Sequence, residues 1–311
     1  MISQDISYIR PETVEEAMQA WAEHTGRPAG KAQTDKAQAE EIPAGVSNGV
    51  RYLGGGTELI TGTRKSGLSG KPFRVLIDLK HVSETRRMES SGGRIFLGST
   101  LSLNEIGDSG FFPLLTATIR NIADRTTRNR LSLGGNIAGN LPYREAVLPL
   151  LLADATIHTI KSVLADDLNL SLRQEYPLRE IFNKRLPLLA GELILGFSLP
   201  AAATTLPWRH YRATRTGPVD YPLVTACFMT DAVGEGDGDS DDDSVKDTAR
   251  KADIAAAFSG LFPYPAWYDS LDTANAALAT PGLVRSDQRA SAEYRLALIS
   301  DMVHRAQEEL S

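Results

Sequence analysis

Two glycine-rich stretches place the strongest constraint on how this chain folds. The first, LGGGTEL, covers residues 53–59 and follows a short strand-like run, and the second, SLGGNIAGN, covers residues 132–140. Glycines at the end of a strand let the backbone adopt positive φ and bring its amides close to a bulky anion. Either stretch alone fits a tight turn or a bulge equally well. Two of them, about 80 residues apart, favour one elongated ligand with a diphosphate at its centre.

Two familiar phosphate-binding motifs fail at the first stretch. The dinucleotide fingerprint G-x-G-x-x-G, read from Gly54, requires glycine where Leu59 stands. The nucleoside triphosphate loop, read from Gly62, reaches Gly67 but has Leu68 in place of the lysine. The first glycine loop therefore belongs to neither class.

Composition narrows the class of protein. A chain of 311 residues with 42% hydrophobic and 23% charged side chains can form two or three globular domains. No apolar run approaches the roughly 18 residues that span a membrane, and the N-terminal residues lack a signal-peptide layout. One cysteine, Cys227, excludes an intrachain disulfide and a multi-cysteine iron–sulfur site within this chain. We expect a cytoplasmic protein that does not bind a membrane.

Negative charge is concentrated in one segment. Residues 231–250 hold eight acidic and two basic side chains, which accounts for the whole net charge of −6. The remaining chain is neutral on balance, so we expect no nucleic-acid partner. The part at residues 234–247 is rich in Gly, Asp and Ser and predicts a solvated loop.

Hydrophobic periodicity predicts an α+β protein. A helix with Val14, Ala17, Met18 and Trp21 on one face follows Thr13, and residues 24–49 then have the composition of a flexible insertion. Strands at 50–53 and 73–79, with a helical segment at 57–65 between them, form a βαβ-type unit. Further elements are expected as strands in RIFLGS, ATIHTI and ELILGFSLP, a helix at 112–123, three antiparallel strands between 208 and 261, and an amphipathic C-terminal helix within 287–310 with Tyr294, Leu298, Met302, Ala306 and Leu310 on one stripe.

The five histidines are far apart in the sequence and indicate no local metal site. We expect each to be a packing or surface side chain. They are His24, His81, His158, His210 and His304.

Several segments, in order, resemble the FAD-binding medium subunit of the molybdenum hydroxylases, the xanthine dehydrogenase and carbon monoxide dehydrogenase group. LGGGTELITGTRKSG is similar to the family's first flavin loop, and TRNRLSLGGNIAGNLPYREAVLPLLLADA to its second. GELILGFSLP resembles a strand that closes the flavin domain, and HYRATRTGPVDYPLVTACF the segment that opens the C-terminal domain. IRPETVEEAMQAW and YRLALISDMVHRAQEEL resemble the two ends, so the likeness covers nearly the whole chain.

The resemblance implies a domain organisation. Residues 1–203 would form a two-part FAD-binding domain, with a small βαβ-type subdomain at about 1–80 and a larger mixed α/β subdomain at 81–203. Residues 204–311 would form a small antiparallel sheet with C-terminal helices, which carries the acidic loop 234–247.

The resemblance also implies site residues. The first loop would lie along the diphosphate and adjoining flavin, the second would complete the cradle, and Glu145 would lie beside the adenosine ribose. Ile122 and Leu193 match apolar flavin contacts, and Arg212 stands where lysine is common. The implied cofactor-binding residues are Gly54, Gly55, Gly56, Thr57, Glu58, Leu59, Ile122, Ser132, Gly134, Gly135, Asn136, Glu145, Leu193 and Arg212. No side chain is implied as a catalytic acid or base, and none as a metal ligand.

The function implied by the resemblance is electron transfer through noncovalently bound FAD. A large partner subunit would carry the molybdenum cofactor, and a small partner would carry two iron–sulfur clusters. Electrons would pass from these clusters to the FAD and then to NAD or another acceptor. Two alternatives stay open: a stand-alone FAD-dependent oxidase or reductase of the same superfamily, and a flavin-binding module without turnover.

Overall fold

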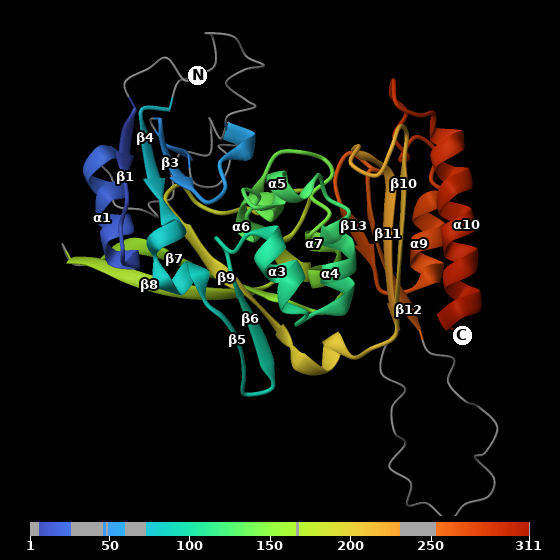
Figure 1. Cartoon of the computed structure of the whole chain (residues 1–311), viewed down its shortest axis with the longest axis horizontal. Coiled ribbons are helices and arrows are strands. Elements are labelled where there is room, and N and C mark those ends of the chain that lie inside the picture. Colours follow the sequence, from blue (N-terminus) through green and yellow to red (C-terminus); the bar gives the residue numbers. More distant parts are fainter. Residues whose placement is uncertain are drawn as a thin grey trace, which may run out of the picture.

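The chain is described from a computed structural model, which gives residues 6–25, 46–47, 49–59, 73–165, 168–230 and 253–310 (Figure 1). The predicted acidic loop 234–247 and most of the predicted insertion 24–49 lie outside these residues. The rest forms a mixed α/β structure with three sheets, as the sequence predicts.

The first sheet contains the predicted βαβ-type unit. Its strands are β1 (Ser7–Ile9), β2 (Val46–Ser47), β3 (Val50–Leu53) and β4 (Val75–Asp78), in the order β1-β4-β3-β2. Strand β4 is parallel to both β1 and β3, as a βαβ-type unit requires. Of the intervening helix predicted at 57–65, residues 57–59 are described and are helical.

Helix α1 (Val14–Thr25) covers this sheet with the predicted face. Val14, Ala17, Met18 and Trp21 are buried with Val75 and Ile77 of β4 in one core cluster. The Trp21 ring stacks on Tyr52, with centroids 4.9 Å apart. The boundaries predicted for the insertion were wrong at both ends. Helix α1 continues to Thr25, and β2 pairs with β3 at residues 46–47.

The second sheet is antiparallel and carries helices on one face (Figure 1). Its order is β5-β6-β9-β7-β8. The strands are β5 (Met88–Ser91), β6 (Arg94–Gly98), β7 (Thr156–Ala165), β8 (Leu168–Pro177) and β9 (Leu193–Pro200). The covering helices are α3 (Leu103–Ser109), α4 (Pro113–Arg120), α5 (Arg125–Arg128), α6 (Leu133–Ala138), α7 (Val147–Leu152) and α8 (Leu178–Ile181), with short 3-10 turns η2 (Leu79–His81), η3 (Ser83–Arg86) and η4 (Ala201–Thr204). Alternate residues of the strands enter the main core beneath these helices, among them Ile95, Leu97, Ile157, Phe197 and Leu199.

Helix α3 begins with a complete capping box. The Ser102 hydroxyl accepts from the Glu105 amide at 3.2 Å, and the Glu105 carboxylate accepts from the Ser102 amide at 2.8 Å. We expect Ser102→Ala to lower the free energy of unfolding by about 1 kcal/mol, because one amide loses its partner. Urea denaturation would measure the loss. Ser90→Ala, at an exposed serine of β5, is the matched control and should change nothing. Equal stability of the two variants would contradict the assigned cap.

The two central strands of the third sheet are buried on both faces. Its order is β10-β11-β12-β13, all antiparallel: β10 (Trp208–Thr214), β11 (Pro222–Thr230), β12 (Ile254–Ser259) and β13 (Ala266–Tyr268). Three of these strands were predicted, and β13 was missed. Cys227 and Ala257 pack into the main core, whereas Phe228 and Phe258 pack into a separate core with helices α9 (Leu271–Leu278) and α10 (Ala292–Leu310). The main core therefore continues across the predicted domain boundary at residue 203.

The C-terminal helix differs from its predicted stripe. Tyr294 is exposed, and the buried face consists of Arg295, Ile299, Met302, Val303 and Ala306. Arg295 can be buried because its guanidinium donates to the carbonyls of Leu223 and Gly260, at 2.6 and 2.7 Å, and to Asp287 at 2.8 Å.

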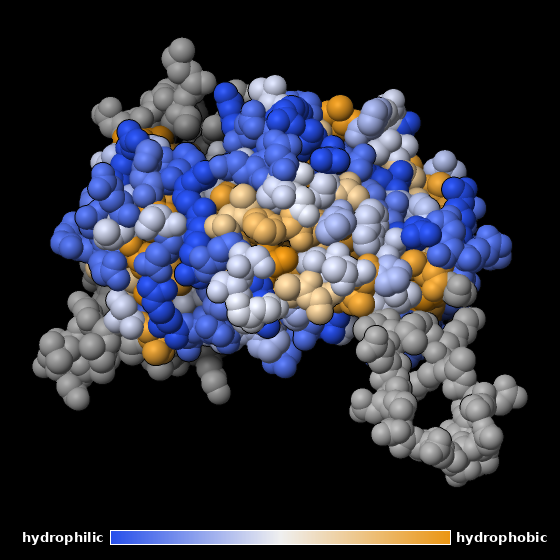
Figure 2. All heavy atoms as spheres, turned by 60° about the horizontal axis from the view of Figure 1, so that its bottom comes forward, coloured by the Kyte–Doolittle hydropathy of each residue, from blue (hydrophilic) through white to orange (hydrophobic). Residues whose placement is uncertain are grey.

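The surface is mostly polar where Figure 2 shows it. Hydrophilic residues cover much of this face, and the hydrophobic residues form small groups between them (Figure 2). Within the described ranges, no helix is both long and apolar enough to cross a bilayer.

Candidate functional site

The structure brings the two glycine loops into direct contact through Ser132. This serine precedes α6, and its hydroxyl accepts from the amide of Gly135 at 3.2 Å. The same oxygen accepts from the amide of Gly55, also at 3.2 Å. Ser132 is 3% exposed, so this junction is buried. One hydroxyl therefore fixes the backbone of both loops at a single point.

The glycines allow this approach because a side chain would have no room. A Cβ on Gly55 would lie 1.6 Å from the carbonyl oxygen of Arg130, and one on Gly54 would lie 2.5 Å from the Ser132 hydroxyl. Gly56 has φ +76, which side-chain-bearing residues rarely adopt. Each glycine of the first loop is thus required by contact or by conformation.

The glycines of the second loop are held against the preceding chain. Gly134 donates to the carbonyl of Ser99 at 2.8 Å, and a Cβ on Gly134 would lie 2.8 Å from the Ser99 Cβ. A Cβ on Gly135 would lie 2.7 Å from the Ser132 hydroxyl. The ligand contacts of these glycines stay predictions, and the structure shows that they pack against Ser99 and Ser132.

A buried acid supports the first loop from β4. Asp78, 1% exposed, accepts from the Lys80 ammonium at 2.7 Å and from the Tyr8 hydroxyl. Burial opposes ionisation, but the hydrogen bonds from Lys80 and Tyr8 outweigh it and lower the pKa of Asp78. Lys80 also donates to the carbonyl of Gly54 at 3.2 Å. Asp78 and Lys80 were not predicted as part of the site, although they stand at the end of the strand predicted at 73–79 and directly after it.

Glu58 and Asn136 accept hydrogen bonds from the backbone at the end of the second loop and beyond it. The Glu58 carboxylate accepts from the Asn140 amide at 2.8 and 3.0 Å. The Asn136 side chain accepts from the Ala146 amide at 3.2 Å. Thr57 and Leu59 lie with Glu58 in the helical turn that follows Gly56. These contacts make residues 54–59 and 132–146 one unit.

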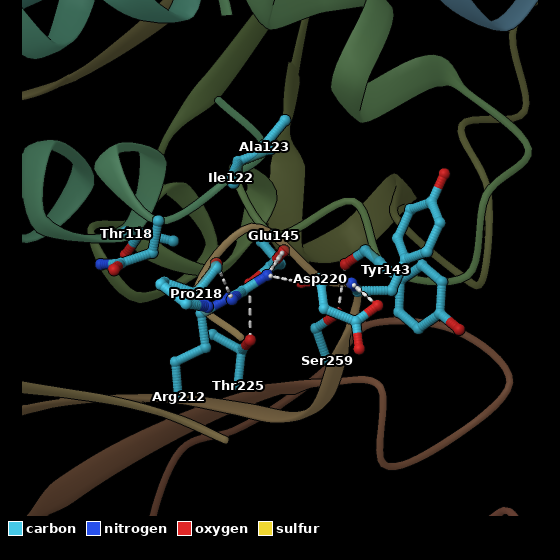
Figure 3. A network of polar contacts seen from close by, with 12 residues as sticks. Thr118, Ile122, Ala123, Tyr143, Glu145, Arg212, Pro218, Asp220, Thr225 and Ser259 are labelled. Atoms are coloured by element: carbon cyan, nitrogen blue, oxygen red, sulfur yellow. Dashed lines mark hydrogen bonds and ion pairs between the residues drawn. The ribbon is translucent and has the colours of Figure 1, made fainter. Parts of the chain in front are cut away.

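Glu145 and Arg212 meet at the boundary between α7 and the third sheet (Figure 3). Glu145 is 4% exposed and accepts from Arg212 Nε at 2.8 Å and from the Thr225 hydroxyl at 2.6 Å. Burial raises the pKa of Glu145, while Arg212 and Thr225 lower it. Arg212 also donates to the carbonyls of Pro218 and Asp220, at 3.0 and 2.8 Å. The two residues therefore join the second glycine loop to the C-terminal region.

The predicted apolar contacts lie in two different cores. Ile122 belongs to the main core and lies above the Glu145–Arg212 pair in Figure 3. Its carbonyl and that of Ala123 accept from Arg128, at 3.1 and 2.6 Å. Leu193 is 1% exposed and lies in the core with α1 and the first sheet. The flavin contacts of both residues stay predictions.

Metal binding has no support in the described part of the chain. Its residues include no group of three or more His, Cys, Asp or Glu side chains that could hold an ion. The arrangement offers instead two glycine loops that meet at the Ser132 hydroxyl, and glycine backbone of this kind lets a bulky anion such as a diphosphate approach closely.

Comparison with known proteins supports a ligand that contains a diphosphate. The sequence matches the FAD binding domain in molybdopterin dehydrogenase over residues 4–202, whereas no curated protein matches it. Three solved structures have a similar fold over 100% of this chain. They are carbon monoxide dehydrogenase from Hydrogenophaga pseudoflava lacking the Mo-pyranopterin moiety (TM-score 0.73, 19% identity, 98% of that chain), reconstituted CO dehydrogenase from Oligotropha carboxidovorans (0.71, 19%, 99%) and quinoline 2-oxidoreductase from Pseudomonas putida 86 (0.65, 22%, 100%). Because the family match covers more than half of the sequence, this chain belongs to the family of FAD-binding domains of molybdopterin dehydrogenases.

Proposed function

We propose that this chain binds FAD noncovalently at the two glycine loops and acts as the electron-transfer subunit of a molybdenum hydroxylase. The observation that carries the proposal is the Ser132 hydroxyl, which accepts from the amides of Gly55 and Gly135 and holds both loops together. The family match over residues 4–202 supports the identity of the cofactor.

The loops suit the diphosphate of FAD. Their glycines carry no side chains, so a bulky anion can approach the backbone closely. We assign the cradle to Gly54, Gly55, Gly56, Thr57, Glu58, Leu59, Ser132, Gly134, Gly135 and Asn136.

Four further contacts complete the proposed site. Ile122 and Leu193 would form apolar flavin contacts. Glu145 would lie beside the ribose while it stays paired with Arg212, and Arg212 would hold that carboxylate in place. When bound, FAD supplies the redox chemistry. The side chains of this chain position it, and none needs to act as an acid or base.

Partners follow from the proposed role. A large subunit would carry the molybdenum cofactor, a small subunit would carry two iron–sulfur clusters, and NAD or another acceptor would take the electrons. The similarity extends along nearly the whole length of the carbon monoxide dehydrogenase and quinoline 2-oxidoreductase chains, which supports membership of such an assembly. Xanthine dehydrogenase-type chemistry and a cytoplasmic location are parts of the same proposal.

The noncovalent attachment of FAD is directly testable. Neither loop, at residues 53–59 or 132–140, contains a histidine or cysteine that could tether the flavin. Acid precipitation of the purified chain should therefore release all of the yellow chromophore to the supernatant. Flavin that stays on the precipitate would favour a tethered, stand-alone oxidase.

The proposed assembly is tested by purifying the native complex through a tag on this chain. We expect two co-purifying subunits, together with FAD, iron and molybdenum in fixed ratios. A flavin-loaded chain that purifies alone from its native cells, without either metal, would contradict the subunit role.

A further inference from the structure

A pocket lies on the face of the second sheet that helices α3 to α8 leave open. Its volume is about 410 Å³, and its lining comes from strands β5 to β9. Side chains alternate between the faces of a strand, so these residues face away from the core that contains Leu97, Ile157 and Phe197. The lining residues are Glu89, Ser91, Arg94, Phe96, Thr156, His158, Glu175 and Ser198.

A chain of four polar side chains in contact runs through this pocket. Arg94 donates to the Ser198 hydroxyl oxygen from Nη2 at 2.9 Å and from Nε at 3.2 Å. Ser198 Oγ lies 2.8 Å from His158 Nε2, and His158 Nδ1 lies 3.3 Å from Glu175 Oε1. The order of contacts is therefore Arg94, Ser198, His158, Glu175.

The direction of every hydrogen bond in this chain follows from its ends. A guanidinium can only donate, so the Ser198 proton cannot be directed at Arg94. The acceptor that the described side chains offer is His158 Nε2, and the tautomer that accepts this proton has Nε2 unprotonated. The proton of the neutral imidazole then lies on Nδ1, where the Glu175 carboxylate accepts it. This is the polarity in which histidine serves as a base toward serine.

The surroundings of His158 keep it neutral. Its pKa is lowered first by burial and then by the positive charges of Arg94 and Arg87, while Glu175 raises it. The Phe96 ring meets the imidazole edge to face, with centroids 5.3 Å apart, and the Arg87 guanidinium lies 4.0 Å from the centre of the same ring. The base is thus held in one orientation beside an apolar wall.

The pocket also provides a positive charge for a developing oxyanion. Nη1 of Arg94 makes no hydrogen bond to another described residue, while Nε and Nη2 hold Ser198 and Nη2 also contacts Thr156 at 3.1 Å. Arg94 is exposed along the pocket rim. A carbonyl oxygen bound beside Ser198 would therefore meet a cation that other contacts already position.

We propose that Ser198 is a nucleophile that small carboxylic esters acylate. His158 would act as its base, and Glu175 would orient His158. Ser198 Oγ bonds to the ester carbonyl carbon while its proton passes to His158 Nε2. The carbon–oxygen bond to the leaving group then breaks, and the alcohol departs with that proton. Water releases the carboxylic acid by attack on the acyl group, with His158 taking the water proton and returning it to Ser198. No oxidant or cofactor is needed.

The probe is p-nitrophenyl acetate, added to the flavin-loaded chain and followed by stopped-flow absorbance. We expect a stoichiometric burst of p-nitrophenolate and an acetylated peptide that contains Ser198 by mass spectrometry. Ser198→Ala should abolish the burst, and His158→Gln should slow acylation by about 100-fold or more, the usual contribution of a general base. Because burial and the nearby arginines lower the pKa of His158, the rate should be half-maximal at a pH below the ordinary histidine pKa of about 6.5.

Ser91→Ala is the matched control, because Ser91 lines the same pocket and makes no side-chain hydrogen bond to a described residue. This variant should keep the wild-type burst. Flavin content and thermal midpoint would be measured for every variant, and His158→Gln decides the question if Ser198→Ala is destabilised. An unchanged burst in a folded Ser198→Ala or His158→Gln variant, no burst in the wild type, or acetylation at another residue would overturn the proposal.

Discussion

Gly55→Val is expected to remove FAD from the chain while most of its fold survives. A Cβ at this position lies 1.6 Å from the Arg130 carbonyl oxygen, and real Cβ contacts essentially never fall below 3.0 Å. The first loop must therefore move away from the second by more than about 1 Å, which breaks the Gly55–Ser132 hydrogen bond. Because both loops are proposed to share one diphosphate, we expect FAD affinity to fall at least about 100-fold, or roughly 3 kcal/mol.

The same variant tests the electron path in the assembled enzyme. Reduction of NAD, or of the natural acceptor, by the hydroxylase substrate should collapse with the FAD content. Oxidation of that substrate with a dye that accepts electrons before the flavin should persist. Flavin content after gel filtration, far-UV circular dichroism and both activities would be measured on one preparation.

Gly217→Val is the matched control, because a Cβ there meets nothing within 4 Å. It should retain FAD and both activities. If Gly55→Val kept its flavin, the proposed cradle would be wrong. If both activities fell equally in an intact complex that kept its metals, the relay role would be wrong.

Local patterns in the sequence predicted most of the fold. The apolar face of residues 14–21 and the strands around the first glycine loop were correct because each follows from side-chain spacing within one element. The third sheet was also predictable as three apolar runs. Strand β13 was missed because Ala266–Tyr268 is too short to show a period.

The features that the sequence did not predict depend on polar contacts between residues far apart in the chain. Arg295 was not part of the stripe predicted for its helix, but carbonyls from β11 and from the residue after β12 accept hydrogen bonds from its guanidinium. The sequence marked both glycine loops, and their connection through Ser132 depends on a contact between residues 77 positions apart. Asp78 and Lys80 were missed for the same reason, because their importance comes from the loop beside them in space.

The cluster around His158 shows most directly what a single sequence does not predict. The separation of His158 from the other histidines predicted a packing or surface side chain. Its partners Ser198 and Glu175 come from neighbouring strands of the sheet, at 40 and 17 positions along the chain. Cross-strand pairing creates this cluster, and a single sequence does not specify which residues pair.

Arg212→Met is expected to be among the most destabilising substitutions at the boundary between the glycine loops and the third sheet. Arg212 and Glu145 have side chains that are 7% and 4% exposed. Without Arg212, the Glu145 carboxylate keeps the Thr225 hydroxyl but loses its counter-charge inside the protein. Leaving one partner of such a pair buried costs about 3–5 kcal/mol, which chemical denaturation at pH 8 would measure. Arg125→Met is the control, because its pair with Asp108 is exposed, and it should have little effect.

The pH dependence identifies the cause of that loss. Burial already raises the pKa of Glu145, and Arg212 opposes this effect, so the variant should have a still higher pKa at Glu145. Between the pKa of Glu145 in the wild type and this higher value, the folded variant binds a proton that the folded wild type does not. Its stability relative to the wild type must then fall as pH rises through that interval. The difference should therefore be largest at pH 8 and smaller at pH 5, where protonation removes the unpaired charge. A difference that stays the same at both pH values would mean that Arg212 stabilises the boundary through its bonds to Pro218 and Asp220, with no contribution from the charge of Glu145.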